Sequence, residues 1–322
     1  MNLADIAIPR EHISENHRVI EPHVRRTPLI QTSGIDFGLG DMPIAFKLES
    51  MQPPGSFKVR GAFTNLLTRK VPQAGVAAAS GGNHGAAVAY AAMRLGIKAR
   101  IFVPTVSSTP KVERIRSYGA ELVITGERYG DTLDACNAYV EESGAINVHA
   151  FDQYETMLGT GTIGFEVSNQ MPDVNTVLVP IGGGGLIAGI ASWFATTDVR
   201  VIGVEPEGAP TMTHALEAGR PVDAPAGSIA NDSLAPRQVG QLVFPIVQQH
   251  VERVVLVSDD EIRAAQKALW NGMTTIAEPG GAAAFAALLA GRYVPEKDER
   301  VCAIVSGGNA AIVIPSPSTS SG

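Results

Sequence analysis

Short runs of apolar residues alternate with segments of helical periodicity through most of this chain, and this order restricts the fold more than any other feature. The apolar runs predict buried strands at 75–80, 99–104, 120–125, 176–181, 199–206 and 300–306. The segments between or beside them predict helices at 83–96, 109–119, 129–144 and 258–270. Strands that are apolar throughout and alternate with helices are typical of sheets covered on both faces. The sequence therefore predicts an α/β fold with mostly parallel sheets.

The composition is that of a soluble globular protein. The 322 residues, 45% hydrophobic and 18% charged, suffice for one large core or two modest ones. The net charge of −7 argues against nucleic acid or an anionic membrane as the main partner. Cys136 and Cys302 lie far apart without metal-ligand spacing, so we expect two reduced, buried thiols. The Ser/Pro-rich tail at 314–322 is expected to lie outside the fold.

One uncharged stretch, residues 174–197, has the length of a membrane span. Pro180 and the four glycines at 182–185 interrupt it in the middle. A strand, a glycine turn and a buried helix explain this pattern better than a spanning helix. Because the beginning of the chain also lacks a signal-peptide pattern, we expect a cytoplasmic protein with no membrane partner.

The four glycines at 182–185 follow a predicted strand and precede a predicted helix. Such a turn exposes consecutive backbone N–H groups at the positive end of the helix, which favours the binding of a phosphate. A second interpretation is open, because Gly183, Gly185 and Ala188 match a loose dinucleotide-binding pattern and Glu205 follows about 20 residues later. From this loop alone, a nicotinamide-dependent oxidoreductase is also possible.

Two further polar turns follow predicted strands. Ser80, Gly81, Gly82 and Asn83 offer N–H and hydroxyl donors to a carboxylate or phenolate, although Asn83 and the following His84 are also compatible with simple helix capping. Ser306 follows the last apolar strand, where the alternative is an ordinary turn. Three such turns in one α/β chain predict a shared crevice at the carboxyl ends of the strands.

Lys58 lies between the apolar residues Phe57 and Val59, directly after a Pro-Pro-Gly-Ser turn. Ser56 is expected to cap a helix that begins here, which places Lys58 in its first turn. Both the helix dipole and burial would favour the neutral amine. A neutral lysine amine is what Schiff-base chemistry requires. The alternative is a surface lysine whose charge reaches solvent.

Several motifs, in this order, carry a resemblance to a known family: "GSFKVRGA", "SGGNHGAA", "GGGGLIAG", "GVEP", "EPGGAAA" and "SGGN". Together they resemble the fold-type II pyridoxal-phosphate enzymes, in the branch of threonine/serine dehydratases and serine racemase, over about residues 20–311. The resemblance implies two open, twisted, mostly parallel sheets flanked by helices. It also implies a large cofactor-binding domain, 1–74 and 148–322, and a small mobile domain, 75–147, that closes over substrate.

The resemblance implies a role for each polar turn. Lys58 would hold pyridoxal phosphate as a Schiff base and, once substrate releases it, act as the base at Cα. Ser80, Gly81, Gly82, Asn83 and His84 would bind substrate. The remaining cofactor contacts would be Phe57 beside the ring, Asn83 at its phenolic oxygen, Ser306 at the pyridine nitrogen, and Gly182, Gly183, Gly184, Gly185 and Leu186 around the phosphate.

The implied reaction is an α,β-elimination that converts a β-hydroxy amino acid, above all L-threonine or L-serine, to a 2-oxo acid and ammonia. Alternatives are a serine or aspartate racemase, a dehydratase specialised for 3-hydroxyaspartate or hydroxylated diaminobutyrate, and a non-catalytic cofactor-binding protein. The nicotinamide interpretation leaves Lys58 unexplained. The resemblance further implies a homodimer.

Two departures from the family pattern bear on the reaction. Racemases of this group carry a serine two residues before the loop's asparagine, where this chain has Gly81, and this favours elimination. Metal-dependent members use a glutamate, a backbone carbonyl and an aspartate, where this chain has Glu205, Ala209 and Thr211. Replacement of a carboxylate by a hydroxyl weakens a divalent site. A divalent cation, a monovalent cation or no metal therefore all stay open.

Two other polar residues have alternative interpretations. Glu278 precedes Pro279 and Gly280, and it is expected either to approach the pyridine ring or to cap the following helix. Arg237 would meet an acidic group of the substrate or, as the simpler alternative, form a surface salt bridge.

Overall fold

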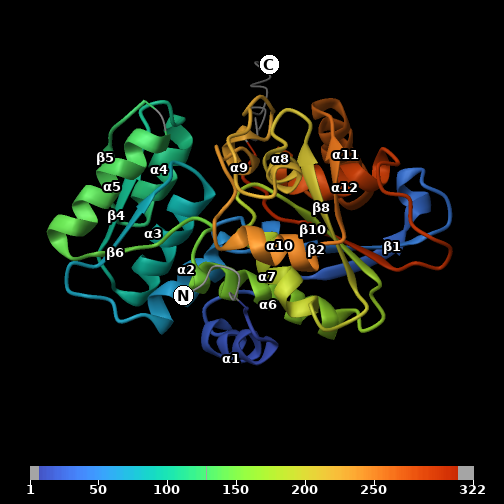
Figure 1. The fold of residues 1–322 in the computed structure, drawn as a ribbon, viewed down its shortest axis with the longest axis horizontal. Coiled ribbons are helices and arrows are strands. Elements are labelled where there is room, and N and C mark those ends of the chain that lie inside the picture. The colour runs from blue at the N-terminus through green and yellow to red at the C-terminus, as the bar shows by residue number, and fades with distance from the viewer. Residues whose placement is uncertain (1–6, 128, 311–322) are drawn as a thin grey trace, which may run out of the picture.

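The computed structural model describes residues 7–127 and 129–310, and the predicted Ser/Pro-rich tail lies outside these ranges. Its strands form a six-stranded sheet in the order β1-β2-β10-β7-β8-β9 and a four-stranded sheet in the order β5-β4-β3-β6. The smaller sheet lies at the left of Figure 1 and the larger sheet at the right. The strands are β1 Leu29–Ser33, β2 Pro43–Leu48, β3 Val76–Ala79, β4 Ala99–Val103, β5 Glu121–Ile124, β6 Ile146–Asn147, β7 Thr176–Pro180, β8 Arg200–Pro206, β9 Arg253–Val257 and β10 Val301–Val305.

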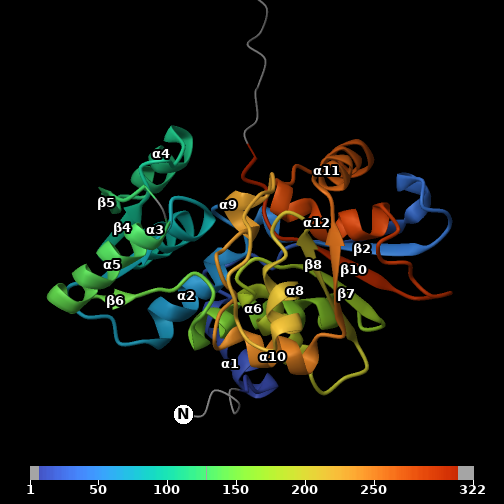
Figure 2. The ribbon, with the colours of Figure 1, turned by 45° about the horizontal axis from the view of Figure 1, so that its top comes forward.

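Helices cover both sheets. They are α1 Arg10–Ile20, α2 Lys58–Thr68, α3 Asn83–Leu95, α4 Thr109–Ser117, α5 Tyr129–Ser143, α6 Tyr154–Gln170, α7 Gly185–Phe194, α8 Thr211–Ala218, α9 Asn231–Leu234, α10 Val243–His250, α11 Asp259–Met273 and α12 Pro279–Leu289, with short 3-10 turns η2 Gly34–Phe37 and η3 Glu49–Met51. Figures 1 and 2 show α11 and α12 on one side of the larger sheet, with α1, α6 and α7 on the other.

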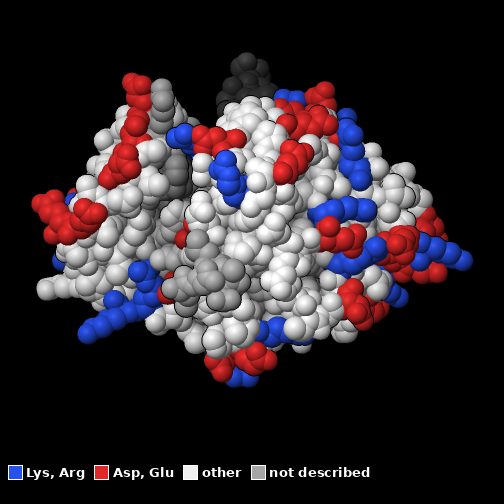
Figure 3. All heavy atoms as spheres, in the orientation of Figure 1, with Lys and Arg blue, Asp and Glu red and all other residues white. Residues whose placement is uncertain are grey.

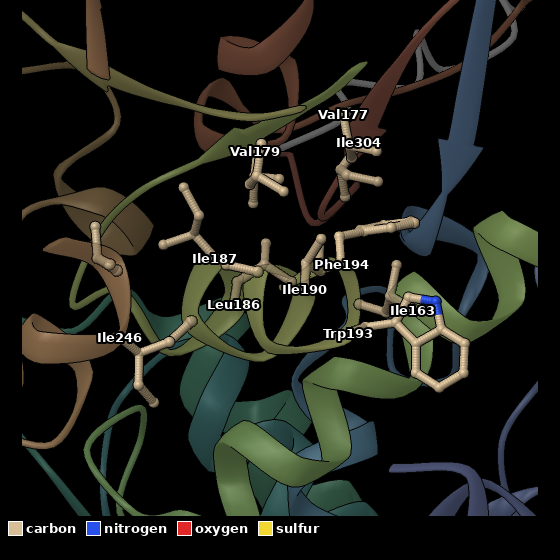
Figure 4. Close-up of a cluster of buried hydrophobic side chains, with 14 of the residues drawn as sticks. Ile163, Val177, Val179, Leu186, Ile187, Ile190, Trp193, Phe194, Ile246 and Ile304 are labelled. Atoms are coloured by element: carbon tan, nitrogen blue, oxygen red, sulfur yellow. The ribbon is translucent and has the colours of Figure 1, made fainter. Parts of the chain in front are cut away.

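The central strands of the larger sheet are buried on both faces. Val177 and Val179 of β7 pack in the cluster that contains α7, whereas Leu178 packs in the cluster that contains α12. Figure 4 shows the first of these clusters, in which Ile187 and Ile190 of α7 lie beneath the sheet. Because successive side chains of a strand point to opposite faces, a strand between two helical layers must be apolar throughout. This explains the uninterrupted apolar runs in the sequence.

The predicted architecture is confirmed. Among the described strands, β1 and β2 pair antiparallel and all other pairs are parallel. The uncharged stretch forms β7, the glycine turn and α7, and no helix within the described ranges is long and apolar enough to cross a membrane. Cys136 and Cys302 are both free and buried, as expected. The strands of the smaller sheet all fall within 75–147, but the division into two domains stays a prediction.

One local prediction was wrong. Ser56 does not cap α2: the helix begins at Lys58, its N-cap position is Phe57, and no side chain caps it. The Ser56 residue instead forms an isolated antiparallel bridge with Gly307, next to the end of β10. The turn therefore places Ser56 in the interior, and its buried hydroxyl has no hydrogen-bond partner among residues 7–127 and 129–310.

Beneath α2 lies a cluster of four buried charges that the sequence did not reveal. Arg60 donates hydrogen bonds of 2.8 Å to both Glu49 and Glu166. Lys47 pairs with Glu166 from the opposite side. Burial alone would raise the pKa of Glu166, but Arg60 and the neighbouring positive charges hold this pKa well below its usual range. The cluster connects β2, α2 and α6, and it thereby fixes the helix that begins with Lys58.

The outer surface agrees with the modest negative charge of the chain. Figure 3 shows acidic and basic side chains interspersed on the face that it presents, and the described side chains of this face form no extended positive patch. An electrostatic surface for nucleic acid is not found there.

Candidate active site

Lys58 is the first residue of α2, and it is half-buried. Its Nζ donates a 2.7 Å hydrogen bond to the carbonyl oxygen of Ala150 and lies 5.0 Å from the centre of the Phe57 ring. Burial lowers the pKa of Lys58 to about 8, and the negative charge of Glu278 acts in the opposite direction. The surface interpretation of Lys58 is therefore wrong. The neutral form of this amine is therefore populated at a lower pH than for an ordinary lysine.

Two histidines border the lysine, and both are neutral. His84 is buried, and its Nε2 donates a 2.7 Å hydrogen bond to the carbonyl oxygen of Val148. Burial, followed by the charge of Lys58, lowers the pKa of His84 to about 3. His149 accepts a backbone N–H from Asp152 at its Nδ1 (2.9 Å), so its proton resides on Nε2. The sequence did not single out His149.

The side chain of Asn83 connects the polar turn at residues 80–83 with residues at the end of the larger sheet. Its Nδ2 donates a 2.6 Å hydrogen bond to Oε1 of Glu278, and its Oδ1 accepts a 2.7 Å bond from Asn309. The capping alternatives are wrong for both Asn83 and Glu278, because neither side chain caps its helix. Burial raises the pKa of Glu278 to about 7, against the effect of the Asn83 hydrogen bond.

The glycine turn after β7 is packed tightly against the chain. A Cβ atom on Gly183 would lie 2.3 Å from the Phe151 ring, and one on Gly185 would lie 2.7 Å from the Phe151 carbonyl oxygen. Gly184 has a φ of 89°, which other residues rarely adopt. The N–H groups of 182–186 donate to no atom of residues 7–127 or 129–310. They stay available to an anion at the N-terminus of α7.

Ser80 and Ser306 belong to the other two polar turns, and the hydrogen bonds of their side chains are long. Ser80 Oγ accepts the N–H of Gly82 at 3.2 Å. Ser306 is buried, donates a long 3.3 Å hydrogen bond to the Gly280 carbonyl oxygen, and gives its own carbonyl to the N–H of Phe57 at 3.1 Å. The last contact places the end of β10 beside the start of α2. The structure therefore gathers all three turns and Lys58 around one region.

Glu205 lies near the end of β8, and Ala209 follows in the turn that leads to α8. Both carboxylate oxygens of Glu205 accept hydrogen bonds, at 2.6 Å from the Met212 N–H and at 2.9 Å from the Thr213 N–H. The hydroxyl of Thr211 donates to the Pro236 carbonyl oxygen at 3.3 Å. Glu205 therefore stabilises a helix N-terminus, and no group of three or more metal-ligating side chains occurs in the described part of the chain.

Arg237 forms the surface salt bridge that was the simpler of its two interpretations. It pairs with Asp223, and its side chain is 83% exposed. This position argues against contact with an acidic group of the substrate.

The residues fit pyridoxal phosphate on the chemistry of the donors present. They offer a half-buried lysine whose amine is partly neutral, an aromatic ring next to it, and a phosphate-compatible turn. They also leave the buried Ser56 hydroxyl without a partner in the described part of the chain, and Ser56 contacts the turn that contains Ser306. Ser56, His149 and Asn309 were missed because only the fold brings them to Lys58 and Asn83. The individual roles of the predicted site residues stay predictions.

Comparisons with known proteins agree on this chemistry. The family model described as "Pyridoxal-phosphate dependent enzyme" matches residues 20–307. The chain is 41% identical over 307 residues to an L-threonine ammonia-lyase of Geobacter sulfurreducens, covering 94% of this chain and 76% of the relative. It is 40% identical to the phenylserine dehydratase of Ralstonia pickettii, covering 89% and 88%. The structure of maize serine racemase superimposes with a TM-score of 0.90 at 33% identity, covering 95% of both chains.

Proposed function

This chain belongs to the family of pyridoxal-phosphate-dependent enzymes, and we propose that within this family it is a dehydratase of β-hydroxy amino acids. It would convert its substrate to a 2-oxo acid and ammonia. The relatives named L-threonine ammonia-lyase and phenylserine dehydratase support a lyase of this type. The nicotinamide interpretation is overturned by the family match.

The observation that carries this proposal is the environment of Lys58. Its amine is held by the Ala150 carbonyl oxygen at 2.7 Å, and its pKa is lowered to about 8. An amine of this kind forms a covalent bond with an aldehyde readily, because the neutral form is the nucleophile. Bound pyridoxal phosphate supplies that aldehyde, and its ring withdraws electrons from the Cα atom of an attached amino acid.

Each residue of the site would then have a defined task, and Asn83 would have two. Lys58 takes the proton from Cα of the substrate and returns it to the β-hydroxyl, which leaves as water. The Ser80–Asn83 turn, with His84 behind it, orients the substrate carboxylate so that the Cα–H bond faces the lysine. Gly182, Gly183, Gly184, Gly185 and Leu186 hold the cofactor phosphate through their N–H groups. Phe57, Asn83 and Ser306 orient its ring.

The substrate is L-threonine or L-serine in this proposal. Phenylserine, 3-hydroxyaspartate and hydroxylated diaminobutyrate share the same reacting atoms and differ in the side chain beyond Cβ. The mobile domain at 75–147, the homodimer and the cytoplasmic location stay predictions. Light scattering of the purified protein tests the homodimer.

The test combines spectroscopy with product analysis. Purified protein is incubated with L-threonine, L-serine, phenylserine and 3-hydroxyaspartate in turn, and the 2-oxo acid and ammonia are measured. At least one substrate is expected to give both products. Lys58→Ala should lose the visible absorbance of lysine-bound cofactor and ~100-fold or more of the rate. Lys70→Ala, at an exposed position after the end of α2, is the control.

Two outcomes would overturn the proposal. The first is the absence of 2-oxo acid from all four substrates. The second is a substrate that changes only its chirality, which would make the protein a racemase.

A further inference from the structure

The loop after β4 places Ser107 against the polar turn at residues 80–83. Strands β3 and β4 are parallel neighbours, in which Ala79 pairs with Phe102. Their following loops therefore leave the sheet at the same edge. Ser80 donates its N–H to the Phe102 carbonyl oxygen at 2.9 Å, which keeps the two loops together beyond the paired residues.

Ser107 occupies the space in which a side chain at position 81 would begin. A Cβ atom on Gly81 would lie 2.0 Å from Ser107 Oγ and 2.9 Å from Ser107 Cβ. At the neighbouring Gly82, the nearest atom would be 3.6 Å away, so this crowding is limited to Gly81. The glycine at 81 and the serine at 107 thus depend on each other.

The Ser107 hydroxyl is available to a ligand. The residue is half-buried, and its side chain makes no hydrogen bond to the described residues on either side of position 128. Its N–H donates to the Pro104 carbonyl oxygen at 3.0 Å, so a tight turn fixes its backbone. The N–H groups of Gly81 and Asn83 likewise donate to no described residue. The hydroxyl and these N–H groups form one set of unused donors.

We propose that Ser107 binds the carboxylate of the substrate together with the Ser80–Asn83 turn. This inference rests on the proposed function, which places an amino acid in the site. A serine hydroxyl donates one hydrogen bond to a carboxylate oxygen, and the negative charge strengthens that bond. Every candidate substrate carries this carboxylate. Ser107 therefore contributes to the recognition of all of them, whatever their side chain.

Binding of an unreactive amino acid tests the inference without catalysis. L-alanine has no β-hydroxyl, and its binding is followed by the change in cofactor absorbance. Ser107→Ala is expected to raise its Kd by ~10-fold or more, as for a hydrogen bond to a charged group. Binding of 2-aminoethanol, which lacks a carboxylate, should not change. Ser108→Ala is the matched control, because Ser108 is exposed and its side chain makes no capping bond.

A second set of variants moves the hydroxyl between the two loops. Gly81→Ser alone should weaken L-alanine binding, because its Cβ meets Ser107. Adding Ser107→Gly removes the two nearest opposing atoms and leaves Val103 Cγ1 at 3.1 Å, so the double variant should bind L-alanine more tightly than Gly81→Ser. A purely structural Ser107 predicts equal effects on L-alanine and 2-aminoethanol.

Three results would separate this inference from the proposed function. A wild-type Kd for Ser107→Ala, or equal weakening of both ligands, overturns the role of Ser107. Weakened L-alanine binding by this variant, in an enzyme that forms no 2-oxo acid, supports Ser107 while the proposed function fails. Wild-type protein that binds no L-alanine contradicts both.

Discussion

Asn83 and Glu278, 195 residues apart in the sequence, are joined by a 2.6 Å hydrogen bond from Nδ2 to Oε1. This bond connects the first residue of α3, beside the smaller sheet, with the N-cap position of α12, beside the larger sheet. Glu278 is also the negative charge that raises the pKa of Lys58 against the effect of burial. One carboxylate therefore acts on two residues of the candidate site.

Glu278→Gln is expected to change how stability depends on pH. The unfolded chain loses this proton near a pKa of 4.5, whereas the folded protein loses it near 7. Between these values the folded state holds more protons, so the free energy of unfolding falls as the pH rises. The variant removes this pH-dependent loss of stability, which is on the order of 3 kcal/mol above pH 7. Urea unfolding of the cofactor-free protein at pH 5 and pH 8 measures the difference.

Asn83→Ala keeps the Glu278 carboxyl group but should shift its pKa, and urea unfolding at different pH values measures this shift. Loss of the donor should raise the pKa of Glu278 further, because its hydrogen bond favours the ionised carboxylate. The fall in stability should therefore extend to higher pH than in the wild type. Parallel pH profiles for wild type and Glu278→Gln would show that this carboxyl group does not titrate as described.

Lys58 should bind pyridoxal phosphate at a rate that rises as the pH passes through about 8. The neutral amine is the reacting form, and burial makes it available well below the ordinary lysine pKa of 10.5. Adding the cofactor to cofactor-free protein at a series of pH values, and following the visible absorbance, measures this. In Glu278→Gln the midpoint of the rate's pH dependence should shift to lower pH, because the negative charge that raises the pKa of Lys58 is absent. A midpoint near 10.5 in the wild type would contradict the buried position of the amine.

The clearest strand predictions were those for β7 and β10, which contain no charged residue. β7 and β10 lie between two helical layers, so their apolar runs predict buried strands directly. β2 was missed because it contains Lys47, which looks like a surface residue in the sequence. Its charge is buried against Glu166, a partner 119 residues away. Such pairing depends on tertiary contacts that no local pattern shows.

In the candidate site, too, local sequence predicted some residues and missed those that only tertiary contacts bring there. The glycine turn and the polar turn of α3 follow strands directly, so their positions at the sheet edges were predictable. Ser56 was assigned to a helix cap because Ser often serves there, yet the bridge to Gly307 draws it inward. Ser107 carries no signal, since only the register of β3 and β4 places it against Gly81.

Removal of divalent cations should leave the activity of the wild type unchanged. Both oxygens of Glu205 accept hydrogen bonds from α8, and Thr211 supplies no carboxylate. Dialysis against a chelator, followed by addition of Mg²⁺ or Mn²⁺, measures the effect. Thr211→Asp is expected to make activity respond to these ions, because hard cations favour anionic oxygens. Thr211→Asn, of the same size but uncharged, is the control, and a wild type that requires Mg²⁺ would contradict the prediction.

Glu166→Ala should destabilise the protein by about 3–5 kcal/mol, because it leaves Arg60 and Lys47 buried without their common partner. Urea unfolding of the cofactor-loaded protein measures the loss.

The low pKa of Glu166 adds a second expectation. The stability that ionised Glu166 contributes is present above the pKa of an unfolded carboxyl group, and it is lost as the pH falls toward the folded value. Arg237→Ala, which removes an exposed ion pair, should have no measurable effect. Equal stability of the two variants would show that the buried cluster does not hold α2 in place.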